Sequence, residues 1–149
     1  VYNGDLLFMT CGFPKRFMQA IRPDGAGNVT KTHVVWETTK GCSYVPSPVA
    51  IGPYFIVVAD NGVASCFVAK TGERLWMERL KGVHSASLLK ANGLVYFLSD
   101  RGIMSVVKPG PEFKLVTENE VGEDTIATPA FSNGHLFVRG VNHLFCIKG

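Results

Sequence analysis

The amino-acid sequence predicts an all-β fold, a β-propeller built from four-stranded antiparallel units of near 40 residues. Turn residues recur on that step, since the run DNG at 60–62 matches DRG at 100–102. Two large aromatic residues, Trp36 and Trp76, keep the same step of 40. No ten-residue window keeps the apolar spacing of an amphipathic helix without a turn residue breaking it. A period near 40 with several short strands per unit is typical of propeller blades.

The unit at 47–80 is the most complete and defines the pattern for the others. Its four strands are expected at residues 48–51, 55–59, 64–68 and 74–80. Asn and Gly tolerate the positive φ of a tight hairpin, so we assign Asp60 and Gly62 to the turn between the second and third strands. Asp100 and Gly102 take the same place one unit later. The two acidic residues are therefore interpreted as turn residues rather than catalytic groups.

The rest of the chain repeats this unit. In the first unit, Val1 and Tyr2 are interpreted as the end of an inner strand, and a long loop is expected at 22–28. Strands follow at 5–10, 17–21 and 33–37 in the first unit, at 86–90, 95–99, 103–108 and 114–119 in the third, and at 129–132, 136–139 and 143–147 in the fourth. The blades are placed at approximately 1–42, 43–82, 83–122 and 123–149, within one partial propeller domain spanning 1–149.

Composition excludes two classes of function. The chain has 149 residues, of which 46% are hydrophobic and 18% charged, as in an ordinary globular domain. The net charge of +3 comes from scattered Lys and Arg, without a basic run interleaved with aromatic residues, so no nucleic-acid partner is expected. No stretch approaches the roughly 18 consecutive apolar residues of a membrane-spanning helix, so no membrane span is expected.

The cysteines and histidines show no metal-binding spacing. Cys11, Cys42, Cys66 and Cys146 form no CxxC pair, and the four histidines form no HxH or HExxH motif. Cys66 and Cys146 lie in expected strands, where burial of a free thiol is common. A disulfide between Cys11 and Cys42 stays open, because sequence does not establish connectivity. We therefore predict no metal ligands and no catalytic residues.

Two polar residues stand out near the expected inner strands. His84 precedes an inner strand, where propeller loops line the central channel. Arg139 lies in a second strand, where the preceding unit has the apolar residue Leu98. We interpret His84 and Arg139 as candidate channel-facing residues. A buried or channel-facing Arg needs a partner, and Glu123 or Asp124 in the preceding loop is the expected one.

The stretch CFVAKTGERLW at 66–76 resembles the quinoprotein-type propeller repeat, the PQQ-binding-like β-propeller repeat family. Thr71, Gly72 and Trp76 match the pattern of that repeat, whereas Val68 stands where Asp is usual and Cys66 where Ala is usual. The resemblance covers almost the whole chain, including the Ser-Pro start of an inner strand at 47–48 and the VVKPGPEF run at 106–113.

The repeat gives these residues structural roles. Gly72 is expected to form the turn between the third and fourth strands, and Thr71 to hydrogen-bond across it. Trp76, with Trp36 one unit earlier, is expected to dock its ring on the adjacent blade. Rings of this family usually have roughly seven or eight blades, which lies within the range known for propellers. The resemblance therefore implies that the chain is the C-terminal part of a larger propeller.

The same resemblance implies three alternative functions. The first is a non-enzymatic scaffold or binding surface in an exported bacterial protein, periplasmic or secreted, with no cofactor and a protein as its partner. The second is the C-terminal half of a PQQ-dependent dehydrogenase, which would hold the quinone beside Ca²⁺; many such enzymes carry adjacent cysteines, and this sequence has none. The third is a propeller similar to the outer-membrane assembly lipoprotein. We favour the first.

Four blades are fewer than such a ring needs, so we expect the end blades to be covered by another polypeptide. Val1 falls inside an expected inner strand, and the fourth unit stops after its third strand at Ile147. Unpaired strand edges and apolar blade faces favour association. The expected partners are the remainder of the same propeller or another copy of the chain.

Overall fold

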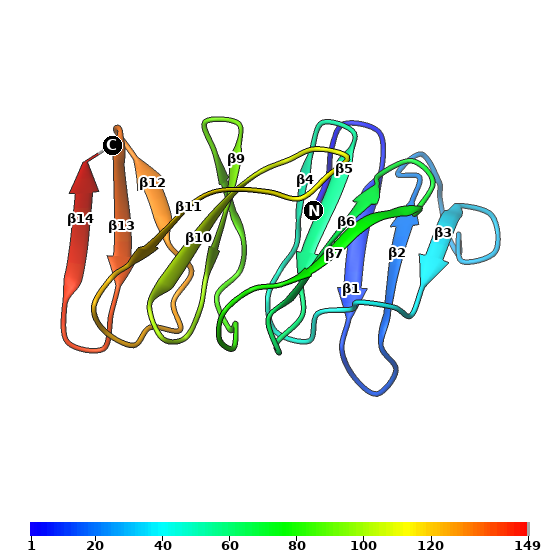
Figure 1. Ribbon diagram of the computed structural model, residues 1–149. Coiled ribbons are helices and arrows are strands. Elements are labelled where there is room, and N and C mark those ends of the chain that lie inside the picture. The colour runs from blue at the N-terminus through cyan, green and yellow to red at the C-terminus, as the bar shows by residue number, and fades with distance from the viewer. Residues whose placement is uncertain (149) are drawn as a thin grey trace.

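The computed structural model describes residues 1–148, within which fourteen β-strands form four antiparallel sheets. Figure 1 shows the sheets side by side in chain order, the first at the right and the fourth at the left. The described residues contain no helix, so the predicted all-β class is confirmed. The strands are β1 (Leu7–Cys11), β2 (Phe17–Ile21) and β3 (Val34–Thr38) in the first sheet; β4 (Val49–Ile51), β5 (Tyr54–Val58), β6 (Val63–Val68) and β7 (Arg74–Arg79) in the second; β8 (Leu89–Ala91), β9 (Leu94–Leu98), β10 (Ile103–Lys108) and β11 (Lys114–Glu120) in the third; and β12 (Ala130–Ser132), β13 (His135–Arg139) and β14 (Leu144–Lys148) in the fourth.

The last three sheets each begin with a strand of three residues, β4, β8 or β12, followed at once by a tight hairpin. At these hairpins Gly52, Asn92 and Asn133 have positive φ values of 53°, 50° and 48°. Two-residue hairpins of this twist need positive φ, which Gly and Asn adopt with least strain. In the first sheet, Val1 exchanges backbone hydrogen bonds with β1 and Tyr2 bridges to it. Val1 and Tyr2 therefore take the place of the short first strand.

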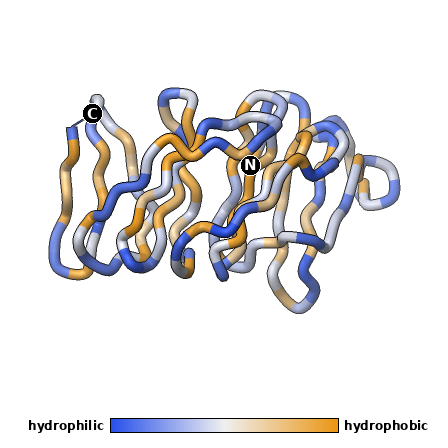
Figure 2. Tube along the Cα trace, viewed as in Figure 1, coloured by the Kyte–Doolittle hydropathy of each residue, from blue (hydrophilic) through white to orange (hydrophobic). Residues whose placement is uncertain are grey.

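Apolar side chains pack between neighbouring sheets rather than into one central core. On β5, Phe55 and Val57 pack toward the first sheet, whereas Ile56 and Val58 pack toward the third. All four are fully buried, because a strand alternates its side chains between two faces and both faces are covered here. β9 and β10 repeat this arrangement between the second and fourth sheets. In Figure 2 the hydrophobic colour accordingly concentrates along the strands and the hydrophilic colour at the turns.

Two tryptophans join one sheet to the next. Nε1 of Trp36, on β3, donates a hydrogen bond to the Ala69 carbonyl of the second sheet at 2.8 Å. Nε1 of Trp76, on β7, donates to the Gly110 carbonyl of the third sheet at 3.1 Å. Each acceptor lies in the turn between the last two strands of its sheet. The tryptophan of one sheet therefore contacts the same turn of the following sheet.

The turn before β7 contains a glycine that leaves room for the ring of Trp36. Gly72 has a φ of 73°, and a Cβ there would approach the indole of Trp36 to 2.6 Å. The hydroxyl of Thr71 accepts a hydrogen bond from the N–H of Glu73 at 3.3 Å. Gly72 is thus needed both for the backbone conformation and for space under the ring.

The first strand of the third sheet begins three residues later than the sequence predicts. The strand expected at 86–90 begins only at Leu89. The N–H of Ser87 donates to Oγ1 of Thr128 at 3.0 Å, and the N–H of Leu88 donates to the Ser47 carbonyl at 3.1 Å. These two amides therefore bond to the fourth and second sheets rather than to β9, so the ladder starts after them.

The four cysteines are free thiols in this structure, so Cys11 and Cys42 are not bridged. Cys66 is buried as expected, and burial raises the pKa of its thiol to about 12. The expected burial of Cys146 is wrong, because this residue is exposed. Cys146 lies on β14, the end strand of the fourth sheet, and no other described strand pairs with that edge.

Candidate functional site

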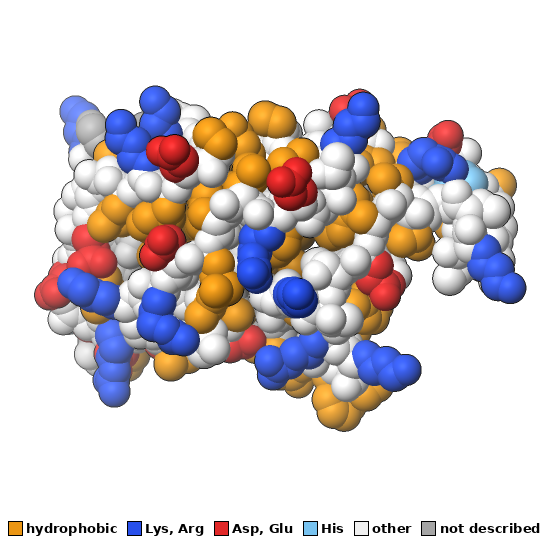
Figure 3. Space-filling view, turned by 45° about the vertical axis from the view of Figure 1, so that its right-hand side comes forward, with side chains coloured by type: hydrophobic (Ala, Val, Ile, Leu, Met, Phe, Trp, Pro, Cys, Tyr) orange, Lys and Arg blue, Asp and Glu red, His pale blue; other side chains and the backbone are white. Residues whose placement is uncertain are grey.

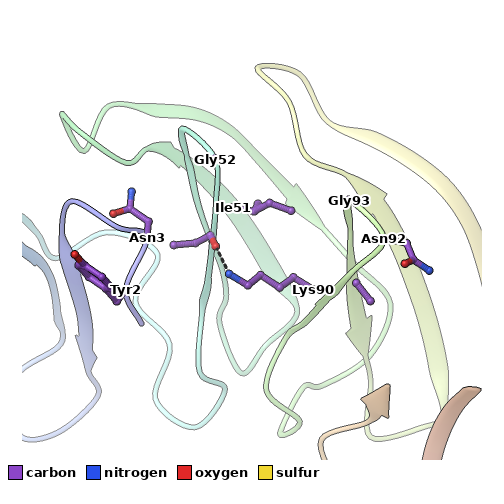
Figure 4. Close-up of a pocket in the computed structure, with 9 residues that line it drawn as sticks. Tyr2, Asn3, Ile51, Gly52, Lys90, Asn92 and Gly93 are labelled. Carbon is purple, nitrogen blue, oxygen red and sulfur yellow. Dashed lines mark hydrogen bonds between the residues drawn. The ribbon is translucent and has the colours of Figure 1, made fainter. Parts of the chain in front are cut away.

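The candidate site is a pocket of about 360 Å³ at the end of the sheets where the short first strands turn. It opens between the first residues of the chain, the β4–β5 hairpin and the β8–β9 hairpin. Lys90 of β8 crosses this space, and its Nζ donates a hydrogen bond to the Ala50 carbonyl of β4 at 2.9 Å (Figure 4). The lining residues are Tyr2, Asn3, Ala50, Ile51, Gly52, Lys90, Ala91, Asn92 and Gly93.

Asn3 and Lys90 leave hydrogen-bond donors available in this pocket. Oδ1 of Asn3 already accepts hydrogen bonds from the N–H groups of Asp5 and Leu6, at 3.1 and 2.9 Å, so its NH₂ group remains. The same contacts explain why β1 begins at Leu7 and not at residue 5. The ammonium of Lys90 has three N–H donors, of which one reaches Ala50. The arrangement therefore favours a ligand that accepts hydrogen bonds.

Two further pockets adjoin the first and form one continuous surface with it. A pocket of about 780 Å³ shares Asn3 and Gly52 with it, and one of about 410 Å³ shares Asn92. We call the combined lining of the three pockets the hairpin surface. It extends across all four sheets, along the upper edge of Figure 1 where the β4–β5, β8–β9 and β12–β13 hairpins lie.

The two flanking pockets combine apolar walls with polar groups, which are charged only in the larger pocket. The larger one is lined by Leu6, Val35, Pro53, Val68 and Ala69, by the cations Arg22 and Lys70, and by the carboxylate of Asp5, beside Asn3 and Gly52. In the smaller one the rings of Tyr96 and Phe131 lie 5.5 Å apart between their centroids. Such mixing of apolar area with polar groups is typical of protein-binding surfaces. On the face shown in Figure 3, Lys and Arg are scattered among other side chains and form no single basic patch.

The predicted turn residues Asp60 and Asp100 lie at the opposite end of the sheets. The carboxylate of Asp60 accepts hydrogen bonds from the N–H groups of Tyr44 and Val45, both at 3.0 Å. The carboxylate of Asp100 accepts from the N–H and the hydroxyl of Ser85, at 2.8 and 2.9 Å. Each Asp thus fastens the loop that enters its sheet to the turn between the second and third strands. We call each such contact a loop latch.

Gly62 and Gly102 lie in the same two turns, with φ values of 84° and 73°. A Cβ on Gly62 would approach the Gly82 carbonyl oxygen to 2.5 Å, and one on Gly102 would approach the Glu123 carbonyl oxygen to 2.3 Å. Both glycines therefore allow the loop between sheets to lie directly on the turn.

The fourth sheet has a similar loop latch, but here the entering loop provides the acceptor and the turn provides the donors. Glu123, in the entering loop, accepts hydrogen bonds from the N–H groups of Asn142 and His143 in the turn, both at 3.0 Å. Although desolvation opposes the change, these hydrogen bonds lower the pKa of Glu123. The expected pairing of Arg139 with Glu123 or Asp124 is wrong. Arg139 is exposed and its Nε donates to the Gly140 carbonyl, while Asp124 pairs with Arg101 at 2.8 Å.

His84 lies in the loop between the second and third sheets and is only 1% exposed. Its backbone N–H donates to the Asp60 carbonyl at 2.9 Å. Nδ1 of its imidazole ring has no partner among the described residues. Burial lowers the pKa of His84, an effect that the nearby Asp100 carboxylate and Gly82 carbonyl partly oppose. The imidazole therefore offers no accessible ligand surface in this structure.

No group of three or more His, Cys, Asp or Glu among residues 1–148 is placed to hold a metal ion. Three of the carboxylates that the sequence singled out, those of Asp60, Asp100 and Glu123, are occupied by hydrogen bonds within the loop latches. In the same residues there is no helix of the length and hydropathy needed to cross a membrane.

Sequence reasoning missed the residues that form the central pocket. Lys90 matches Ala50 on the 40-residue step, and a Lys at an inner-strand position that is otherwise small and apolar was the available signal. Asn3 also lines the pocket, although the Asn-Gly pair at 3–4 by itself indicates only a turn. The pocket itself arises between hairpins of different sheets, which no local pattern reports.

Comparisons with known proteins agree with this architecture. The outer membrane protein assembly factor BamB of Burkholderia pseudomallei is 29% identical over 110 residues, which make up 72% of this chain and 28% of that protein. No family model matches the chain. The crystal structure of BamB from Moraxella catarrhalis superposes with a TM-score of 0.71 at 15% identity, over 96% of this chain and 42% of that one.

A europium-containing methanol dehydrogenase is also similar, with a TM-score of 0.60 at 13% identity over 79% of this chain and 23% of that one. The chain therefore spans well under two thirds of the length of each of these proteins. At such identities the structural matches show the fold, and the sequence match to BamB makes the quinoprotein-type repeat family plausible. The four sheets are blades of a β-propeller.

Proposed function

We propose that this chain is a scaffold segment of an exported protein and that its hairpin surface binds another protein. The observation that carries the proposal is the continuity of the three pockets, which share Asn3, Gly52 and Asn92 and so extend across four blades. A site for one small molecule would instead be expected as a single enclosed cavity. Most residues of the central pocket are exposed or half-buried, which suits a broad partner surface.

The relation to BamB supports the more specific form of the proposal. BamB of Burkholderia pseudomallei is named as an outer membrane protein assembly factor, and it is the sequence relative with 29% identity. We therefore propose membership of the quinoprotein-type repeat family, a location in the periplasm or outside the cell, and a part in outer-membrane protein assembly. In this role the propeller contributes binding and does not catalyse a reaction.

Site-specific photo-crosslinking in the producing cell tests the proposal. Tyr2 lines the central pocket and is 54% exposed, so p-benzoylphenylalanine fits there with little disturbance. Tyr44 is the matched control, because it is 58% exposed and lies at the opposite end of the sheets, beside Asp60. We expect a discrete protein adduct from position 2 and none from position 44. Equal labelling, or no adduct at either position, would contradict the proposal.

A second measurement separates the scaffold from the dehydrogenase alternative. Purified protein is mixed with PQQ and Ca²⁺, and the quinone absorbance and dye-linked alcohol oxidation are recorded. We expect no spectral shift and no activity, because the described carboxylates that fasten the loops are already hydrogen-bonded. A stoichiometric shift with alcohol oxidation would replace the scaffold proposal with the dehydrogenase.

A further inference from the structure

We propose that the hairpin surface recognises an extended acidic segment of its protein partner, with a carboxylate of that segment bound by Lys90. The inference rests on the proposed function, since it names the chemistry of the partner that this surface takes. The neighbouring apolar side chains of the segment occupy the two flanking pockets.

The preference for a carboxylate ligand follows from the hydrogen-bond donors in the central pocket. Nζ of Lys90 uses one of its three N–H groups on the Ala50 carbonyl at 2.9 Å and forms no ion pair among residues 1–148. Asn3 uses its oxygen on the local backbone, which leaves its NH₂ group as a donor. The hydroxyl of Tyr2 donates to the Gly4 carbonyl. A carboxylate, which accepts hydrogen bonds and carries a negative charge, matches the free N–H donors of Lys90.

Charge along the rest of the surface favours the same partner. The lining contains the cations Arg22, Lys70 and Lys90 and the single carboxylate of Asp5. Arg22 is partly compensated by Asp24, 3.7 Å away, whereas Lys70 and Lys90 are in no ion pair within the described part of the chain. An acidic segment therefore gains from complementary charge, and a basic one is disfavoured.

The extended conformation follows from the positions of the pockets. The central pocket adjoins both flanking pockets, one lined by the first and second blades and the other by the third and fourth. A segment that occupies all three must therefore cross the hairpin ends of four blades in an extended form. The apolar wall formed by Leu6 and Val68, and the Tyr96–Phe131 pair, line the two flanking pockets.

The test uses fluorescence anisotropy with two labelled peptides of equal length. One repeats Leu-Ser-Glu and the other repeats Leu-Ser-Gln, so they differ only in the carboxylates. We expect the Glu peptide to bind about tenfold or more tightly than the Gln peptide, as for a charge-assisted hydrogen bond. Lys90→Gln should remove most of the preference for the Glu peptide, and Lys90→Arg should retain most of it.

Lys15→Gln is the matched control variant, because Lys15 is exposed in the turn between β1 and β2, at the opposite end of the sheets. It should leave both affinities unchanged, and circular dichroism confirms that each variant is folded. Equal affinity for the two peptides, or an equal effect of Lys90→Gln and Lys15→Gln, overturns the inference while the protein-binding function stands. If neither peptide binds, the inference is also overturned, and a missing adduct at Tyr2 in the cell then removes the proposed function as well.

Discussion

Ser43 and Ser65 are both fully buried, yet only one of their hydroxyls has a protein partner. Oγ of Ser43 donates to the Pro46 carbonyl at 2.6 Å, whereas Oγ of Ser65 has no partner among the described residues. We expect Ser43→Ala to lower the free energy of unfolding by about 1–2 kcal/mol, and Ser65→Ala to leave it unchanged or raise it slightly. Urea denaturation measures both. An equal loss in the two variants would show that a bound water satisfies Ser65.

His84 predicts a dependence of stability on pH. Because burial holds the pKa of the folded imidazole below its ordinary value of 6.5, the unfolded chain binds a proton first as the pH falls. The contribution of the neutral imidazole is therefore fully present above pH 6.5 and is lost as the pH falls from there toward the folded pKa. Urea midpoints between neutral and acid pH should show this loss.

The matched variants for that measurement are His84→Gln and His135→Gln. His84→Gln should flatten the pH dependence, because it removes the buried group that titrates. His135 is only half-buried, at the start of β13, so its replacement should preserve the wild-type loss. A pH profile that is unchanged by His84→Gln would assign the acid sensitivity to another group.

At the scale of the element, two turn glycines allow the cost of backbone strain to be distinguished from the cost of a steric clash. Gly93 and Gly102 have nearly equal φ values of 74° and 73°, but a Cβ meets nothing within 4 Å at Gly93 and the Glu123 carbonyl oxygen at 2.3 Å at Gly102. We expect Gly93→Ala to cost about 1 kcal/mol of unfolding free energy, from backbone strain alone. Gly102→Ala should cost clearly more, and Gly62→Ala should resemble it. Similar losses at Gly93 and Gly102 in denaturant titrations would refute the close contact between loop and turn.

Trp76 of the second blade docks on the third blade. Trp76 is 8% exposed, stacks edge-on against Phe113 at 5.2 Å and donates to the Gly110 carbonyl. Trp76→Ala should lower the free energy of unfolding by roughly 3–5 kcal/mol, as for other buried large aromatic residues. Met77 follows on the opposite face of β7 and is 52% exposed, so Met77→Ala is the control and should change little. Equal denaturation midpoints for the two variants would rule out the docking role.

The elements show which features a sequence can predict and which it cannot. The hairpins at Asn92 and Asn133 were predictable, because the Asn-Gly signal is local and the φ values it requires are the ones observed. The loop latch of Asp60 was not, because its partners Tyr44 and Val45 lie 15 to 16 residues earlier in a loop without a regular pattern. The pocket around Lys90 depends on three different blades for its shape and was missed for the same reason.

At the scale of the whole molecule, stability is shared between neighbouring blades through their interfaces. The interface between the second and third blades contains Ile56, and the interface between the third and fourth contains Val138, both fully buried. In stacked repeats each unit is stabilised chiefly by its neighbours, so a cavity acts on the two blades that border it. A substitution at one interface is therefore expected to leave a distant blade largely unaffected.

Amide hydrogen exchange followed by mass spectrometry measures this directly on the 149-residue chain. β5, β6, β9 and β10 are buried on both faces and should exchange slowest, and the exposed outer strand β11 should exchange fast. Ile56→Ala should speed exchange in the second and third blades together. Val138→Ala should speed it in the third and fourth blades and leave β5 and β6 protected, because it opens a cavity on the far side of the third blade. Uniform acceleration of every strand by either variant would instead show that the four blades unfold as a single cooperative unit.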